Sequence, residues 1–459
     1  MRIVGIDYII IIAYLLVIVA SGILGSIRAG NQEDYLVAGR HLPLPIYVAC
    51  ITTVVIGGGA TFGAATQAFN NGISAVWMVT MFGVGILSLG FLLSTKLSNL
   101  RILTISDMLT LRYKREAGMI SAIISAFYTM MVAVTNAIAL GVTFSAMMGW
   151  PLKLAIFIAA GIALAYTLLG GMTSIALTDT IQFTIMTIAI FFILLPQGFS
   201  KVGGIAGLKD TLPESYFDIG AVGVHKIFSW FILFALGLAI GQDIWQRVFS
   251  AKNSSVAKRG TVIGGIYTIL WAIAMTFAGM FAFSLAPGID PQNALSETVL
   301  LIVPAGFRAG IMSAFLSTIS GCMLASSTLI LNDILRLDNG KIARTRVMVI
   351  AVGGTVIALS VAIQSVLTAL DIAYAILSGC IFVPVIAGFF WKRANWKGAC
   401  GSMVMSFFAV VCSMIKWGTS STAPIMIGIV ISVVSIIVIS LITEPEDPEK
   451  LTEWENKLI

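Results

Sequence analysis

Charged residues are scarce in this sequence: aspartate, glutamate, lysine and arginine together make up 10% of its 459 residues, against about 25% in ordinary soluble domains. Hydrophobic residues account for 58%. A soluble domain of this composition would lack the polar side chains that cover a surface facing water, so the composition excludes that class. It predicts an all-α polytopic membrane protein, because helices satisfy their own backbone hydrogen bonds in lipid.

Histidine and cysteine are also scarce. The two histidines, His41 and His225, lie near segment ends, and the five cysteines are scattered through apolar stretches without metal-ligand or disulfide spacing. We find no pattern that resembles a nucleophile–base pair, so we do not expect an enzyme. The net charge of +6 resides in short loops between apolar segments, where it sets topology and does not indicate nucleic acid. The expected partners are the lipid bilayer and a small-molecule solute, and nothing requires an oligomer.

Runs of about 20 apolar residues, the length that crosses a bilayer, recur along the chain. They predict about thirteen transmembrane helices in a single membrane domain over 1–459, at 6–26, 43–69, 72–94, 117–147, 151–170, 172–197, 223–249, 260–285, 305–335, 343–363, 366–391, 397–416 and 424–442. With the N-terminus outside, 20 of the 27 lysines and arginines fall on the cytoplasmic side. This bias predicts a multi-pass protein of the cell inner (plasma) membrane with its C-terminus in the cytoplasm. The tail 443–459 and the stretch RYKREAG (112–118) are expected to be solvated there.

Two predicted segments are interrupted by glycine, namely VVIGGGATFG (54–63) and FALGLAIGQD (234–243). Each glycine inside a helix costs about 1 kcal/mol relative to alanine. Close helix packing is one reason to keep them. The other is a pair of discontinuous helices, which open the two halves of an inverted repeat and mark the binding site of a secondary transporter. That interpretation predicts a first repeat over 43–197 and a second over 223–391, with one extra helix before them (6–26) and two after them (397–442).

The stretch AFLSTISGCMLASSTLILND (314–333) carries six hydroxyls before its first charge. One or two such hydroxyls would bond to neighbouring carbonyls or join helices. On a helix, however, five hydroxyl residues share a stripe about 100° wide with Thr318 on its flank, and these are Ser313, Ser317, Ser320, Ser327 and Thr328. A stripe of this kind opposite a broken helix indicates a site where neutral oxygens bind a hard cation.

Asp179 lies about eight residues into the segment 172–197, which places it about 12 Å from the cytoplasmic end of that helix. An acid at this depth is costly and is by default a functional hypothesis. The alternative is a carboxylate that reaches the interface or is capped by Thr178 and Gln182. Asp243 and Asp371 lie near segment ends, where acids more often cap a helix or form an ion pair.

Five motifs follow one another along residues 33–333: EDYLVAGRHLPL (33–44), GGGATFGAATQAFNNGIS (57–74), YTLLGGMTSIALTDTIQF (166–183), GQDIWQRVFSAKNSSVAKRG (241–260) and AFLSTISGCMLASSTLILND (314–333). In this order they resemble the sodium:solute symporter family, which includes proline, pantothenate, sialic acid and sugar carriers. The resemblance implies a leucine-transporter-like fold with a five-plus-five inverted repeat. It also implies symport driven by Na⁺.

The same resemblance implies a Na⁺ site made of backbone carbonyls and hydroxyls, contributed by Thr53, Ile56, Ala314, Ser317 and Thr318. It implies further that Asp179 and Ser320 complete a second Na⁺ site or assist the release of Na⁺ into the cytoplasm. Gly321 stands where the family has another hydroxyl, and this departure argues against a second ion.

The solute is less well defined by the sequence. Where sugar carriers of the family contact sugar through side-chain amides, this chain has Val55, Ala60 and Gly241, which disfavours sugar. The pair Gly241–Gln242 is similar to the amino-acid and carboxylate carriers, and half-helix N-termini favour anionic groups. We therefore expect import of an amino acid or other small carboxylate by alternating access. The candidate solute contacts are Gly57, Gly58, Gly59, Gln242, Tyr128, Trp230, Phe234 and Tyr374.

Several alternatives remain compatible with the sequence. A proton-coupled symporter of the same fold would titrate Asp179 and use the hydroxyl stripe only for packing. A carrier of sugar or another neutral solute is a second alternative. A channel or a sensor on the same scaffold is a third, although no kinase-like domain follows residue 442.

Overall fold

The computed structural model describes residues 36–169, 171–304, 316–337 and 342–458, together with Gly5, 9–10, 12–13, 16–17, 20–21, Ile23 and Arg308. These residues form helices and connecting turns, and their one β feature is an isolated bridge between Leu42 and Ala251. The predicted all-α class is confirmed. The predicted helix 6–26 lies largely outside the described residues.

Nine helices within the described ranges are long and apolar enough to cross a membrane, and two shorter apolar helices, Leu44–Val55 and Leu152–Ala165, accompany them. One of the nine, Gly59–Leu92, holds parts of two predicted segments and turns at Gly72. Gly72 has a φ of 60°, and a Cβ there would lie 2.4 Å from Cα of Tyr216, so only glycine fits. The prediction of thirteen helices is matched in part, because residues 305–307 and 309–315 and most of 6–26 are not described.

The first half of the molecule opens with a helix that is broken in its middle. Its elements are α3 (Leu44–Val55), η2 (Gly59–Gly63), α4 (Ala64–Asn71), α5 (Val76–Leu92), α8 (Arg115–Met148), α9 (Leu152–Leu169), α10 (Met172–Thr187), η4 (Ile188–Leu194) and α11 (Leu195–Val202). Two short helices, α6 (Ser94–Leu100) and α7 (Ile105–Arg112), connect α5 to α8.

The second half repeats this order and also opens with a broken helix. Its elements are α13 (Val224–Trp230), η6 (Phe231–Ala235), α14 (Leu236–Ile240), α15 (Gln242–Ser250), α16 (Ser254–Leu285), α19 (Leu316–Thr328), η8 (Leu329–Ile334), α20 (Ile342–Ile363), α21 (Val366–Cys380) and α22 (Phe382–Phe390). The outer connections hold α12 (Gly204–Thr211) and α17 (Ala294–Ile302).

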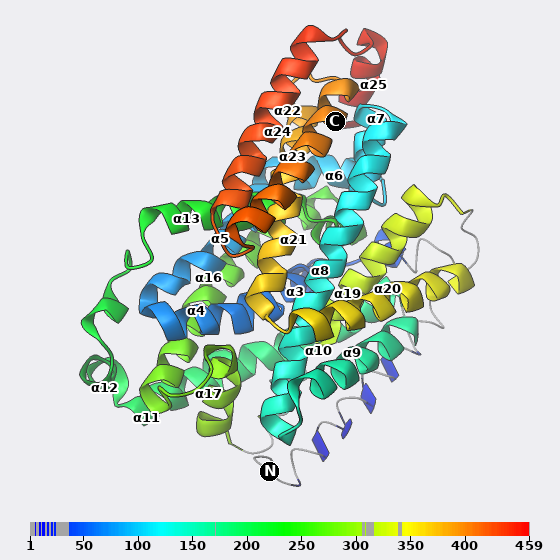
Figure 1. The fold of residues 1–459 in the computed structure, drawn as a ribbon. Coiled ribbons are helices and arrows are strands. Elements are labelled where there is room, and N and C mark those ends of the chain that lie inside the picture. Colours follow the sequence, from blue (N-terminus) through cyan, green and yellow to red (C-terminus); the bar gives the residue numbers. More distant parts are fainter. Residues whose placement is uncertain are drawn as a thin grey trace.

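Equivalent helices of the two halves pack against each other. α5 contacts α16, α8 contacts α19 and α9 contacts α20 (Figure 1). This pairing is what an internal twofold relation between the halves produces, and it brings the two broken helices together at the centre. The bridge between Leu42 and Ala251 joins the start of the first broken helix to the end of the second.

Three helices follow the second half. α23 (Trp396–Trp417) and α24 (Ala423–Ile442) form a helical hairpin beside α21, drawn in orange and red in Figure 1. α25 (Pro448–Leu458) lies against α6 and α7.

The expectation of a solvated tail is therefore wrong for α25. Trp454 is 4% exposed, its ring lies 5.6 Å from that of Phe389, and its indole N–H donates to the Gly388 carbonyl at 3.2 Å. The stretch 112–118 also departs from expectation, because Arg112 is 1% exposed. Its guanidinium donates to the carbonyls of Gly388 and Ala394, since these terminal carbonyls need donors once they are buried.

Candidate functional site

The first helix break lies at the glycine triplet. α3 ends at Val55 and is followed by Ile56, whose φ of −83° and ψ of 31° depart from helical geometry, and a π-helical turn begins at Gly59. Asn136 on α8 stabilises the break, because its Oδ1 accepts the Gly58 N–H at 2.6 Å while its amide donates to the Val132 carbonyl. The predicted discontinuity is present.

The glycines of this break are required by close contacts. A Cβ on Gly57 would lie 2.4 Å from Oδ1 of Asn136, one on Gly58 would lie 2.6 Å from Cβ of Ala139, and one on Gly59 would lie 2.6 Å from Cδ1 of Leu370. These distances are too short for real carbon contacts, so α8 and α21 approach the unwound backbone directly. The absence of side chains at Gly57, Gly58 and Gly59 therefore allows α8, α19 and α21 to approach the unwound backbone closely.

Thr318 on α19 contacts the first break. Its hydroxyl donates to the Thr53 carbonyl at 3.2 Å, and it lies against Gly57. The carbonyl of Ile56, at the end of α3, accepts a hydrogen bond from the Thr61 hydroxyl at 2.8 Å. Two of the predicted Na⁺ ligands, Thr53 and Thr318, are therefore in contact, and Ile56 lies at the same helix break. Ala314 and the side chain of Ser317 lie outside the described residues.

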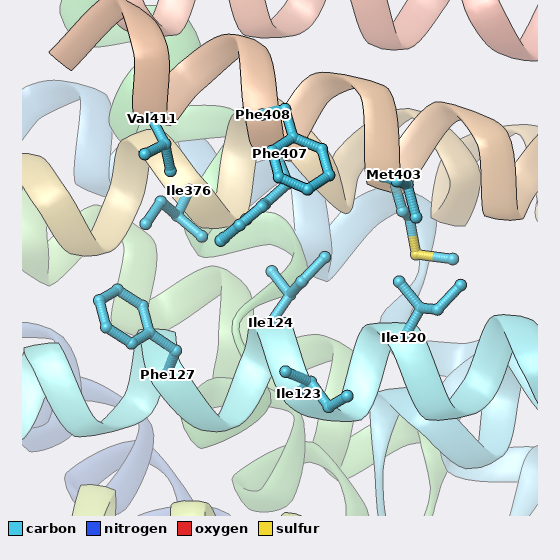
Figure 2. A pocket seen from close by; sticks show the side chains of 10 residues that line it. Ile120, Ile123, Ile124, Phe127, Ile376, Met403, Phe407, Phe408 and Val411 are labelled. Atoms are coloured by element: carbon cyan, nitrogen blue, oxygen red, sulfur yellow. The ribbon is translucent and has the colours of Figure 1, made fainter. Parts of the chain in front are cut away.

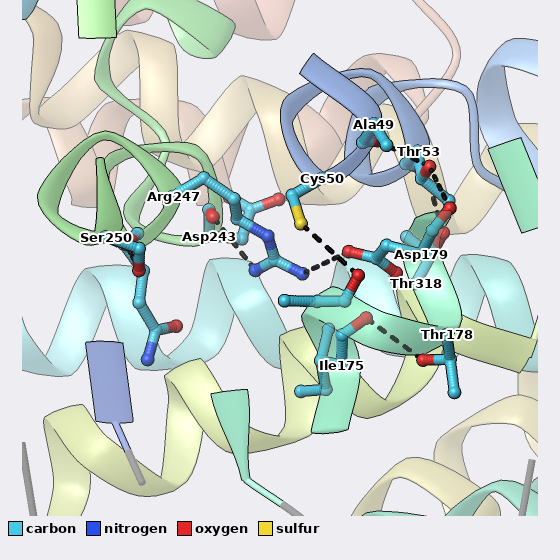
Figure 3. A network of polar contacts seen from close by, with 12 residues as sticks. Ala49, Cys50, Thr53, Ile175, Thr178, Asp179, Asp243, Arg247, Ser250 and Thr318 are labelled. Carbon is cyan, nitrogen blue, oxygen red and sulfur yellow. Dashed lines mark hydrogen bonds and ion pairs between the residues drawn. The ribbon is translucent and has the colours of Figure 1, made fainter. Parts of the chain in front are cut away.

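A buried ion pair flanks this group of oxygens. Nη2 of Arg247 on α15 lies 3.9 Å from Oδ2 of Asp179 on α10, and both side chains are at most 1% exposed (Figure 3). The guanidinium lies against α19 at Gly321, where a Cβ would be 2.3 Å from Nη2. Ser320, the other residue predicted near Asp179, is fully buried.

The carboxylate of Asp179 thus faces a protein cation. α10 is aligned with α3 by backbone contacts, since the Thr53 hydroxyl donates to the Asp179 carbonyl at 3.3 Å and the Cys50 thiol lies 3.9 Å from the Ala176 carbonyl (Figure 3). The alternative of a carboxylate at the membrane interface does not match this burial.

The second helix break lies at Gly241. Its φ of −64° and ψ of 130° are extended, so α14 ends at Ile240 and α15 begins at Gln242. Asp243, in the first turn of α15, is 1% exposed, and its Oδ1 accepts the Tyr128 hydroxyl at 3.1 Å. The expectation that Asp243 lies at a helix end is met, but the residue is buried in the centre of the fold.

Four buried aromatic side chains adjoin the second break, and we call them the aromatic box: Phe82, Tyr128, Phe234 and Tyr374. Tyr374 on α21 is their common neighbour, with ring centroids 5.3 Å from Tyr128, 5.3 Å from Phe234 and 5.9 Å from Phe82. Three of the four predicted aromatic contacts, Tyr128, Phe234 and Tyr374, therefore meet. Trp230 lies elsewhere, in a small cavity with Lys226 and Asp371.

Gln242 serves a different purpose from the one predicted. Its Oε1 accepts the Ile105 N–H at 2.8 Å, and its Nε2 donates to the Leu103 carbonyl at 3.2 Å. The side-chain amide therefore connects the start of α15 to the start of α7. Because both ends of the amide are engaged, we leave Gln242 out of the solute contacts below.

An apolar cavity of about 340 Å³ lies between α8, α21 and α23. Figure 2 shows that its labelled lining consists of isoleucine, phenylalanine, valine and methionine side chains, among them Ile124, Phe127 and Phe407. A polar solute would lose its hydrogen bonds to water there without replacement. This cavity is therefore not the candidate solute site.

Two residues of the site were missed in the sequence. Asn136 lies in an otherwise apolar helix, and a polar amide at that depth was a usable signal. Arg247 was counted among the cytoplasmic loop residues because it follows the second break by only six positions. The break at 234–243 was predicted, but not its consequence, which is that the helix after the break lies inside the bundle.

Comparison with known proteins agrees with this geometry. The family model described as "Sodium:solute symporter family" matches residues 35–406. The chain belongs to the sodium:solute symporter family. It is therefore a membrane transporter of the class that couples a solute to Na⁺, and the proposed resemblance is confirmed.

Two curated relatives illustrate the range of the family. The osmoregulated proline transporter of Bacillus subtilis (strain 168) is 24% identical over 91% of this chain and 91% of its own length. The sodium/glucose cotransporter 4 of Danio rerio is 26% identical over 90% of this chain and 73% of its own length.

Solved structures give the same fold. A Na⁺-coupled sialic acid symporter in a substrate-bound outward-open state superposes with a TM-score of 0.82, at 18% identity, over 96% of this chain and 99% of its own. A nucleobase-cation-symport-1 family transporter gives a TM-score of 0.58 at 15% identity, over 93% of this chain and 99% of its own. The chain shares the leucine-transporter-like fold of these transporters.

Proposed function

We propose that this symporter imports a small solute together with one Na⁺, which binds where α19 meets the first helix break. The observation that carries the proposal is the contact of 3.2 Å between the Thr318 hydroxyl and the Thr53 carbonyl. When the Thr318 hydroxyl turns its proton away from the Thr53 carbonyl, both neutral oxygens can coordinate a cation without movement of the helices. The Ile56 carbonyl lies at the same break, and Ala314 and Ser317 are proposed as the remaining ligands on the same segment as Thr318.

The oxygens present suit Na⁺. They are neutral carbonyl and hydroxyl oxygens, which hard cations prefer. Ile56 is the C-cap residue of α3, and the C-terminal end of a helix carries partial negative charge that favours a cation. The site needs no large buried charge of the protein, so Na⁺ can leave it toward either side of the membrane.

Energetics support one ion. A single Na⁺ that enters down 100 mV releases about 2.3 kcal/mol, which sustains roughly fifty-fold accumulation of a neutral solute. Asp179 already faces Arg247, and we propose that it positions α10 against α3 while Na⁺ passes, with no second ion at Ser320.

The solute class that the geometry supports is a small organic molecule with a polar head group, such as an amino acid. The relatives include a proline transporter and a glucose cotransporter. Gly241 and Ala60 offer no side chain that could contact sugar hydroxyls. We propose Tyr128, Phe234 and Tyr374 as solute contacts and place the N-terminus outside, with about thirteen helices and a cytoplasmic C-terminus in the plasma membrane.

Uptake by proteoliposomes tests this proposal. A Na⁺ gradient with the pH clamped on both sides should drive accumulation of a radiolabelled solute chosen from an amino-acid screen. The variant Ser317→Ala/Thr318→Ala should need at least tenfold more Na⁺ for half-maximal uptake, since two ligands are lost. Uptake that follows a proton gradient and ignores Na⁺ would overturn the coupling, and unchanged Na⁺ dependence in the double variant would overturn the site.

A further inference from the structure

Two buried acids and one buried guanidinium lie near the second helix break. Arg247 is fully buried and lies between two buried carboxylates, those of Asp179 and Asp243. Its Nη2 forms the ion pair with Asp179, whereas its Nη1 donates to the backbone carbonyl of Asp243 at 3.1 Å and not to the carboxylate (Figure 3). Among the described residues, no lysine or arginine forms an ion pair with the Asp243 carboxylate. The guanidinium therefore pairs with the Asp179 carboxylate and contacts only the backbone of Asp243.

The fold stabilises the Asp243 carboxylate in part. Asp243 lies in the first turn of α15, where the partial positive charge of the helix N-terminus favours a carboxylate. The Tyr128 hydroxyl donates to its Oδ1. These contacts explain how the acid is tolerated in the absence of a cation, but they do not neutralise it. A bound cation would stabilise the ionised form of this buried acid, because a buried charge is costly unless it is paired.

The surroundings of the carboxylate favour an organic cation. Tyr128 connects it to the aromatic box, whose rings are at most 3% exposed. The faces of tyrosine and phenylalanine attract ammonium groups, and an aromatic cage is the usual way in which proteins recognise them. Phe82 and Phe234 close the far side of the box, with centroids 4.7 Å apart.

The unwound backbone at Gly241 also favours the binding of a cation. The elements α13, η6 and α14 run without interruption from Val224 to Ile240, so their C-terminal carbonyls carry partial negative charge at Gly241. A Cβ on Gly241 would lie 2.9 Å from Oδ1 of Asp243 and 3.0 Å from Oη of Tyr128. The backbone thus reaches both groups, and the helix end adds a second source of negative potential beside the carboxylate.

We propose that Asp243 and the aromatic box bind the ammonium group of the transported solute, which would be an amino acid or another organic amine. This inference rests on the proposed function, because it assigns the solute of that same transport site. The rings of the box contact one another in this structure, and the ammonium group enters between Tyr374 and Tyr128. The bound cation then gives the Asp243 carboxylate an ion-pair partner.

Sets of small molecules that differ in one charged group test the proposal. L-alanine, L-lactate and L-alaninamide have similar shapes, but lactate lacks the ammonium group and alaninamide lacks the carboxylate. L-leucine, its α-hydroxy acid and L-leucinamide form a larger set, and tetramethylammonium represents the cation alone. The measurement is the thermal unfolding midpoint of the purified full chain in NaCl, because a ligand of the folded state raises it. Matched scans in KCl show the effect of Na⁺ alone.

We expect stabilisation by the members that carry an ammonium group and none by the hydroxy acids. Asp243→Asn keeps the shape and the helix-capping ability of the side chain. In this variant the concentration of an ammonium compound that gives half-maximal stabilisation should rise at least tenfold. Tyr374→Leu should lose the same stabilisation and Tyr374→Phe should retain most of it, since the ring face is kept. Asp210→Asn, an exposed acid on α12, serves as the control.

Equal stabilisation by hydroxy acids, an unchanged response of Asp243→Asn, or no response to any ammonium compound would overturn this inference. Stabilisation by Na⁺ over K⁺ in the absence of solute reports on the Na⁺ site separately. If Na⁺ stabilises the chain but ammonium selectivity is absent, the solute assignment alone fails. If Na⁺ has no effect, the proposed coupling fails first.

Discussion

The guanidinium of Arg247 rests directly on Gly321, because a Cβ at residue 321 would lie 2.3 Å from Nη2. The same nitrogen lies 3.9 Å from Oδ2 of Asp179. Glycine at 321 therefore leaves room for a protein cation beside the intramembrane acid. At residue 321 the chain lacks the hydroxyl that the resemblance leads one to expect, and the guanidinium of Arg247 occupies the space beside it.

This arrangement predicts that one Na⁺ crosses with each solute molecule. The positive charge that a second ion would bring to Asp179 is already supplied by Arg247, and two cations around one carboxylate would repel each other. The Na⁺ dependence of uptake should give a Hill coefficient of about 1. Reversal potentials measured in proteoliposomes over a series of imposed Na⁺ and solute gradients check the ratio. A stoichiometry of two Na⁺ to one solute would contradict the prediction.

Removal of one partner of the buried pair should be costly. Arg247→Gln leaves Asp179 facing no guanidinium, and breaking a buried ion pair costs about 3–5 kcal/mol. The double variant Asp179→Asn/Arg247→Gln should recover part of that loss, because residue 179 then carries no unpaired charge. Thermal unfolding in detergent measures both effects.

The exposed pair Lys392–Glu455 is the comparison, with side chains 77% and 46% exposed. Lys392→Gln should change stability by less than about 1 kcal/mol, since solvent screens the charges. Additive losses in the Asp179/Arg247 double variant would show that the two residues do not act as a pair.

The glycine triplet predicts a position-specific effect of one methyl group. Gly57→Ala places a Cβ 2.4 Å from Oδ1 of Asn136 and 2.9 Å from Cγ2 of Thr318, so α8 or α19 must move. Overpacking of this kind costs about 1–3 kcal/mol. The Na⁺ concentration for half-maximal uptake should rise several-fold, because Thr318 is displaced from the break.

Gly161 on α9 provides the matched control, since a Cβ there would have no neighbour within 4 Å. Gly161→Ala should leave Na⁺ dependence unchanged and stabilise the helix by about 0.5–1 kcal/mol. Equal effects of the two substitutions on Na⁺ dependence would mean that the contact between Gly57 and Thr318 is not part of the site.

The broken helices were predictable because their signal is local. Three consecutive glycines are unfavourable in any helix, so the sequence around Gly57 indicates a break without knowledge of its neighbours. The hydroxyl of Thr318 was likewise identified from its own segment together with a family resemblance. The helix break and the Thr318 hydroxyl could be predicted without knowing which residues contact them in the folded protein.

The roles of Arg247 and Gln242 were not predictable in this way. Arg247 is charged and close to a segment end, which on a sequence suggests a loop, whereas Gln242 follows the second glycine interruption, where we predicted a solute contact. Their actual positions depend on α15 entering the bundle after Gly241, and on its contacts with α10 and α7. The partners lie 68 and 137 positions away in the chain, respectively. The docking of α25 was missed for the same reason, since its charged composition conceals one buried indole.

That indole gives the final prediction. Trp454 lies on Phe389, and its N–H donates to the Gly388 carbonyl, while the rest of α25 is largely polar. Trp454→Ala removes the main apolar contact of the helix, a change that costs about 3–5 kcal/mol at a buried site. Because most other residues of α25 are exposed, we expect the cost to appear as local undocking, with faster proteolysis between residues 443 and 458 and little change in the global unfolding midpoint. Trp417→Ala, where the ring is 48% exposed, should leave the cleavage rate unchanged. Equal protection of the tail in Trp454→Ala and in the unmodified chain would show that α25 is held by other contacts.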